Sequence, residues 1–196
     1  MTFWRPDILG APNIPKALHT VNPRTINGNY WWNKTRQVAY AKHDYCCWAC
    51  GIPKQHADYH QWLEAHEDYD FNWQTGEVKL KEIVALCHSC HGFIHNGRLL
   101  SVYLKGEESS DKVLDILRHG FSICERNNVQ PYFGAFFTLN IMMGQSEEKA
   151  MINARKSGWT PQNVTAKWED WHLNLDGMQY HSPWKTEEDW KNHWKK

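Results

Sequence analysis

Hydrophobic and polar residues alternate in the middle of the chain with the two-residue period of a β-strand. The alternation covers residues 69–73, stops at a Gln-Thr-Gly-Glu turn at residues 74–77, and resumes through Val78 and Leu80. Two alternating runs joined by a short glycine-containing turn are typical of a β-hairpin. This pattern predicts two adjacent strands. The cysteine-rich stretch at residues 87–90 follows the second strand.

A helical period replaces the strand period after residue 100. Residues 110–126 place their apolar side chains on one helical stripe behind a candidate capping residue, Ser110. A second apolar segment covers residues 132–143, and residues 146–157 lie between two helix-boundary residues, Ser146 and Gly158. The stripe of the first helix consists of Val113, Leu114, Leu117, Phe121 and Cys124.

The C-terminal residues return to strand alternation around a second turn. Alternation from Trp168 stops at Asp176–Gly177 and resumes over the next four residues, which predicts a hairpin. A last short helix is expected from Thr186. The chain has twelve tryptophans, far more than its length leads one to expect, and we expect most of them to anchor hydrophobic cores.

The N-terminal residues lack a clear period and contain several prolines and glycines. We expect residues 1–37 to form an extended basic arm, with a short helix starting near Asn33 and leading towards the first cysteines. Residues 55–66 place Tyr59, Trp62 and Leu63 at helical spacing, and a helix is expected there.

Composition indicates a folded globular protein. The chain has 196 residues, of which 41% are hydrophobic, enough to bury a core. It has no apolar run of membrane-spanning length, and its first residues lack the pattern of a secretion signal. We therefore expect a cytoplasmic protein with no membrane partner.

The cysteines form the strongest motif of the sequence. Cys47 and Cys50 make one C-x-x-C pair, and Cys87 and Cys90 make another. In a reducing compartment such pairs favour metal over disulfides, and two of them supply the four soft ligands of a tetrahedral structural zinc. Cys46 is a weaker candidate ligand because it lies outside the C-x-x-C spacing.

Three histidines lie near these pairs. His91 and His95 are four residues apart, so a helix opening at Cys90 would present both imidazoles on one face. His66 precedes the predicted hairpin. Together they leave room for a second metal ion. His56, His60 and His88 are expected to be polar surface positions, with His60 as a spare ligand.

Charge is distributed unevenly although the formal net charge is zero. Basic residues outnumber acidic ones in residues 1–54, and acidic residues outnumber basic ones in residues 55–100. A basic arm beside a metal-binding centre suits a partner that carries phosphates, and a solvated mixed surface is the alternative.

Residues 38–100 resemble the HNH family of ββα-metal nucleases, in the subgroup with two cysteine knuckles. The likeness is carried by the two C-x-x-C pairs, by Leu-Glu-Ala-His-Glu at residues 63–67, and by Leu-Cys-His-Ser-Cys-His with Ile94-His95. The resemblance implies a phosphodiester hydrolase in which a divalent ion stabilises the leaving 3′ oxygen. It implies a bacterial or phage setting as well.

The resemblance also implies roles for single residues. His91 would bind the catalytic ion, and His95 would be a second ligand or a phosphate contact. His66 stands at the first-strand position, where it is either the general base or a ligand with Glu67 as the base. The catalytic candidates are therefore His66, Glu67 and His91, and Glu82 falls near the family's middle polar position.

The sequence thus predicts an α+β protein in four parts. These are the extended arm at residues 1–37, a zinc-stabilised HNH-like ββα core at residues 38–100, a helical scaffold at residues 101–158, and a tryptophan-rich hairpin with a C-terminal helix at residues 159–196. The expected cofactors are a structural Zn²⁺ and a catalytic Mg²⁺, Mn²⁺, Ni²⁺ or Zn²⁺, and the expected partner is DNA. The alternative is a non-catalytic zinc module that binds DNA or, through the C-terminal half, another protein.

Overall fold

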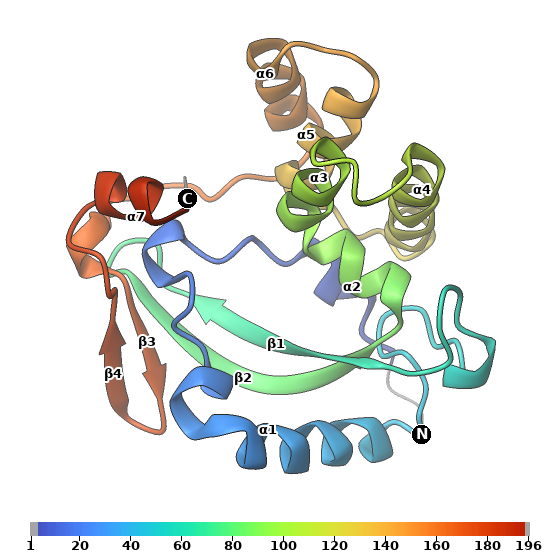
Figure 1. The fold of residues 1–196 in the computed structure, drawn as a ribbon, viewed down its shortest axis with the longest axis horizontal. Coiled ribbons are helices and arrows are strands. Elements are labelled where there is room, and N and C mark those ends of the chain that lie inside the picture. Colours follow the sequence, from blue (N-terminus) through green and yellow to red (C-terminus); the bar gives the residue numbers. More distant parts are fainter. Residues whose placement is uncertain (1–3, 195–196) are drawn as a thin grey trace. The chain divides into compact units, whose positions relative to one another are not determined.

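A computed structural model describes residues 4–194 and has an α+β fold (Figure 1). These residues contain seven α-helices and a four-stranded sheet with strand order β1-β2-β3-β4. They divide into two units, each with its own hydrophobic core. The first unit comprises residues 4–13, 39–66 and 84–160, and the second comprises residues 14–38, 67–83 and 161–194. Each unit therefore contains segments that are distant from one another in the chain.

The predicted central hairpin is present and is longer than its sequence pattern. β1 covers Glu64–Phe71 and β2 covers Glu77–Leu86. Asn72 N–H donates to Glu77 O at 2.8 Å where the turn closes. The expected helix at residues 55–66 is wrong: only a 3₁₀ turn, Lys54–His56, forms before β1 begins. Tyr59 has a φ of 71°, which a helix does not accommodate.

The first unit is mainly helical. α2 (His88–Ile94) packs against α4 (Ser110–Arg126), α3 (Asn96–Leu104) packs against α5 (Phe133–Met142), and α5 packs against α6 (Glu147–Ser157). The helices α4, α5 and α6 confirm the segments expected after residue 100, and Cys124 is buried in α4 as expected. The ring of Phe93 on α2 packs directly against Gly120 on α4. A Cβ atom at position 120 would lie only 2.1 Å from this ring, so the glycine permits the close contact between the two helices.

The second unit is built around the C-terminal hairpin. β3 (His172–Leu175) and β4 (Met178–His181) pair antiparallel around Asp176–Gly177, as predicted. β3 also pairs in parallel with β2 through residues 77–79, a contact that the sequence pattern does not predict. α7 covers Glu187–Trp194, and Lys16 Nζ lies 2.9 Å from Glu187 Oε1.

The N-terminal residues are more helical than expected. α1 covers Pro23–Lys42 and has a non-helical residue, Gly28, with a φ of 80°. The helix begins well before Asn33 because Asn22 and Thr25 cap it. Asn22 Oδ1 accepts from Thr25 N–H at 2.9 Å, and Pro23 suits the first helical position. The arm is thus not extended through residue 37, although two short 3₁₀ turns, Pro6–Gly10 and Lys16–Leu18, precede α1.

The tryptophans are less buried than expected. Only Trp32, Trp48 and Trp171 among the twelve are buried, all twelve lying within residues 4–194. Trp62 is 61% exposed and stacks on a histidine, which places it at the candidate site. None of the helices in residues 4–194 is both long and apolar enough to span a lipid bilayer.

Candidate metal centres

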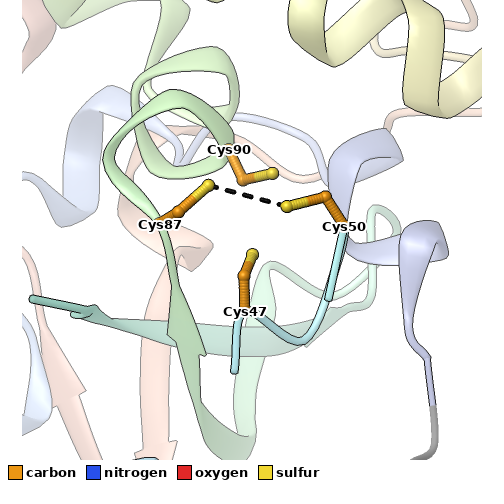
Figure 2. A group of neighbouring side chains, drawn as sticks. All are labelled: Cys47, Cys50, Cys87 and Cys90. Carbon is orange, nitrogen blue, oxygen red and sulfur yellow. Dashed lines mark hydrogen bonds between the residues drawn. The ribbon is translucent and has the colours of Figure 1, made fainter. Parts of the chain in front are cut away.

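Four cysteines converge in the first unit, as the sequence predicts. Cys47 and Cys50 lie in a turn that closes with Gly51 N–H donating to Cys47 O at 2.7 Å, and Cys87 and Cys90 lie at the start of α2. Figure 2 shows the four sulfurs pointing towards a common centre. All four Sγ atoms lie within 4.8 Å of one another, so this sulfur site could hold one metal ion.

The spacing of the sulfurs fits zinc. A Zn–S bond of about 2.3 Å in a tetrahedron places neighbouring sulfurs roughly 3.8 Å apart. Cys50 Sγ and Cys87 Sγ lie 3.7 Å apart, and all six cysteines are free thiols, so no disulfide competes for these ligands. Hydrogen bonds from the thiols of Cys47, Cys87 and Cys90 hold the pKa of Cys50 far below its ordinary value. Hydrogen bonds with Cys47 and Cys50 in turn raise the pKa of Cys87 and Cys90, so a bound metal ion would be needed to hold all four sulfurs as thiolates.

A histidine outside the sequence motif contacts the sulfur site. His119 of α4 places Nε2 at 3.4 Å from Cys90 Sγ. A hydrogen bond with Cys50 raises the pKa of His119, and burial opposes this rise. A protonated His119 would offset part of the negative charge of four thiolates. Only the packing of α4 against α2 brings this residue to the sulfurs, so the local sequence carries no signal for it.

Three histidines form a second group, which we call the imidazole site. His66 comes from β1, His91 from α2, and His95 from the residue that follows α2. One ring nitrogen of each lies within 4.8 Å of the others. His66 Nδ1 and His95 Nε2 are 3.2 Å apart, and a tetrahedral ion with Zn–N bonds of about 2.0–2.1 Å would need roughly 3.3 Å. The expected combination of His66, His91 and His95 is thus present.

The electrostatics of the imidazole site favour neutral rings. Burial, followed by the nearby His95 and His91, lowers the pKa of His66 well below its ordinary value. Burial also lowers the pKa of His95 to about 3, and His91 and Arg98 act in the same direction. A neutral imidazole keeps a lone pair for a metal ion, so both rings are in the state that binds one.

Glu64 joins the imidazole site to a third group of residues. Its Oε2 accepts from His91 Nδ1 at 2.6 Å, and its Oε1 lies 2.7 Å from His88 Nδ1 and 3.0 Å from His60 Nε2. Burial opposes ionisation of Glu64, but the hydrogen bonds from His88 and His91 hold its pKa well below the usual range. Glu64 is therefore a carboxylate that orients His91.

The two histidines beside Glu64 are not simple surface residues. Side chains of His60 and His88 are 13% and 27% exposed, and both contact Glu64. Sequence analysis did not select Glu64. The available signal was its position two residues before His66 on a strand, which places both side chains on one face.

Comparisons with protein-family models, curated proteins and solved structures find no match to this chain. The assignment of function therefore depends on the residues and their geometry.

A pocket of about 140 Å³ opens beside the imidazole site. Arg98 and Lys112 bring positive charge to its wall, and Lys112 Nζ is paired with Glu108 Oε1 at 2.6 Å. Arg98 is exposed and makes no ion pair within residues 4–194. The other lining residues are Glu64, His88, His91, Gly92, His95, Leu99, Val102, Glu108 and Ile116.

Glu67 and Glu82 belong to none of the candidate metal-binding groups within residues 4–194. Glu67 follows His66 on β1, and strand alternation directs adjacent side chains to opposite faces. Glu82 lies on β2, within the second unit. The roles expected for these two residues therefore remain predictions.

Proposed function

We propose that this chain is a metal-dependent endonuclease of the HNH type, which hydrolyses phosphodiester bonds in DNA. The observation that carries the proposal is the convergence of His66, His91 and His95 beside the sulfur site. His66 lies on β1, His91 lies on α2 and His95 follows α2, and the order β1-β2-α2 is the element order that the family resemblance implies.

His66, His91 and His95 would hold the catalytic ion. That ion would stabilise the negative charge that develops on the leaving 3′ oxygen of the phosphodiester. Three nitrogen donors favour Mn²⁺, Ni²⁺ or Zn²⁺ over Mg²⁺, which prefers oxygen ligands. Glu64 engages His91 Nδ1, so Nε2 is the nitrogen of that ring which can bind the ion.

A group of this chain must take the proton of the attacking water. The spacing of His66 Nδ1 and His95 Nε2 favours His66 as a ligand, which moves the role of base to a carboxylate. Glu64 lies on the same strand face as His66 and lines the pocket, and Glu67 is directed to the other face. Glu64 is engaged by His91 and its lowered pKa makes it a weak base, so His66 and Glu67 remain the candidate bases.

The charges around the pocket suit a phosphate. Buried neutral imidazoles contribute no positive charge, and Lys112 is compensated by Glu108. Arg98 and a bound divalent ion would then attract the phosphate, since a bound cation is the largest local charge in such a site. Arg98 can hold two phosphate oxygens at once through its planar guanidinium.

Plasmid cleavage tests the proposal. Protein whose zinc content has been measured is incubated with supercoiled plasmid and Mg²⁺, Mn²⁺ or Ni²⁺. Wild type should nick the plasmid, and His91→Ala should be slower by about 10²-fold or more. His56→Ala is the matched control, because His56 is exposed and belongs to none of the metal-binding groups found within residues 4–194, and it should behave as wild type.

The contrary outcome is equally specific. If folded, zinc-containing wild type cuts no duplex, single-stranded or branched DNA with any of the three ions, the nuclease proposal is wrong. Retained DNA binding that His91→Ala leaves unchanged would then indicate a non-catalytic zinc module.

A further inference from the structure

His60, Glu64 and His88 form a third group of candidate metal ligands beside the imidazole site. His60 lies in the loop before β1, Glu64 is the first residue of β1, and His88 is the first residue of α2. One nitrogen or oxygen atom of each lies within 4.8 Å of the others. Three separate segments of the first unit thus converge on one point.

The orientation of His60 is fixed from two sides. Its Nδ1 lies 3.1 Å from the carbonyl oxygen of Trp62, and a carbonyl only accepts, so Nδ1 carries the proton. The Trp62 ring stacks on His60 at a centroid separation of 3.8 Å and an interplanar angle of 1°. A ligating histidine usually donates its second ring N–H to a carbonyl in this way. Nε2 of His60 is therefore presented to Glu64.

The geometry around Glu64 suits a cation. His60 Nε2 lies 3.0 Å from Glu64 Oε1, which is a carboxylate oxygen and therefore an acceptor. His88 Nδ1 contacts the same oxygen at 2.7 Å. Two imidazole nitrogens and one carboxylate oxygen are a donor set that catalytic zinc sites use.

We propose that His60, Glu64 and His88 bind a second divalent transition-metal ion, distinct from the ion of the imidazole site. Glu64 connects the two positions, because Oε1 faces His60 and His88 and Oε2 holds His91. Binding at one position therefore fixes a residue that serves the other. This inference goes beyond the nuclease function and concerns metal binding alone.

The connection through Glu64 has a consequence for affinity. An ion at the third group would restrain Glu64, and Glu64 orients His91 at the imidazole site. Coupling between two binding equilibria is reciprocal, so each ion should change the affinity for the other by the same factor. Loss of His60 should therefore also alter metal binding at the imidazole site, although His60 does not belong to it.

Cobalt titration tests the proposal. Co²⁺ is added to full-length protein that carries one zinc per chain, and calorimetry reports the number of equivalents bound. Absence of thiolate-to-cobalt absorption verifies that the sulfur site keeps its zinc. Wild type should bind two equivalents, and His60→Ala and His88→Ala should each bind one. His56→Ala is the control and should bind two.

A wild-type measurement covers the case in which these variants fail to fold. Cadmium NMR of the zinc-containing wild type should show two resonances from nitrogen and oxygen sites. One equivalent of Co²⁺ and one such resonance in wild type would overturn the proposal, because His60 and Glu64 would then be a plain ion pair. Two equivalents in His60→Ala would overturn it as well.

The two proposals fail separately. Wild type that cleaves plasmid but binds one equivalent refutes the third group and keeps the nuclease. Wild type that binds two equivalents and cleaves no DNA keeps the third group and refutes the nuclease.

Discussion

Replacing one ligand of the sulfur site should destabilise the protein far more than replacing another buried cysteine. Cys90 and Cys124 are both buried in the core of the first unit, at 0% and 1% exposure, and only Cys90 belongs to the sulfur site. Cys90→Ser and Cys124→Ser therefore make the same chemical change in the same core. The difference in stability between the two variants therefore measures the contribution of the bound metal.

The magnitude follows from the zinc. A structural zinc contributes an apparent 10–16 kcal/mol or so to folding, so one of four ligands accounts for about 2.5 kcal/mol at the lower end. A hydroxyl buried in place of the thiol adds roughly 1–3 kcal/mol. Cys90→Ser should thus cost about 3.5–5.5 kcal/mol, which lowers Tm by roughly 7–22 °C for a protein of this size. Cys124→Ser should cost only the hydroxyl contribution.

Thermal unfolding followed by circular dichroism, with elemental analysis of the same samples, measures both effects. Cys124→Ser should keep one zinc per chain after dialysis against a mild chelator, and Cys90→Ser should lose it. Equal melting temperatures and equal zinc contents for the two variants would refute the assignment of Cys90 as a zinc ligand.

Three further predictions concern the imidazole site and the core. His66→Ala should slow plasmid cleavage by about 10²-fold, and it should also weaken metal binding if His66 is a ligand. Glu67→Gln should reduce the cleavage rate less than this. A Glu67→Gln variant as inactive as His66→Ala would identify Glu67 as the base. The lowered pKa values of His66 and His95 leave both rings neutral in the folded protein, while the unfolded chain takes up protons below about pH 6.5. Without added divalent ion, stability to urea should therefore fall from pH 6.5 to pH 5 by up to about 2 kcal/mol for each residue, and a His95→Gln variant with an undiminished loss would contradict this cause. Gly120→Ala should cost about 1–3 kcal/mol in the same urea assay because its Cβ would meet Phe93 at 2.1 Å, and unchanged stability would mean that α2 and α4 can separate without cost.

Local sequence patterns were sufficient for the regular elements and for the sulfur site. A C-x-x-C pair has its geometry within four residues, so Cys47 and Cys50 needed only the second pair to complete a tetrahedral set. The helix at Ser110–Arg126 likewise follows from a stripe of apolar side chains, and the C-terminal hairpin follows from its turn residues. Each of these signals lies within a short segment of the chain. Such features depend little on the rest of the chain.

Tertiary packing determined what the sequence did not reveal. His119 reaches Cys90 only because α4 packs on α2, and β3 joins β2 in parallel across about ninety residues of chain. The run at residues 55–66 has helical spacing, yet the part of it that precedes β1 forms the loop that carries His60 to Glu64. Helical spacing of apolar residues can occur in a loop as well as in a helix, so the spacing alone does not predict which of the two forms. The contacts of the folded chain determine the outcome.

Locating the metal ions in the protein tests the central claim most directly, namely that His66, His91 and His95 hold an ion apart from the sulfur site. Crystals grown with Mn²⁺ and measured by anomalous scattering at the zinc and manganese edges would place each ion. The account predicts a zinc peak among Cys47, Cys50, Cys87 and Cys90 and a manganese peak bonded to nitrogens of the three histidines. A zinc peak among the cysteines with no peak at the histidines, at saturating Mn²⁺, would contradict it.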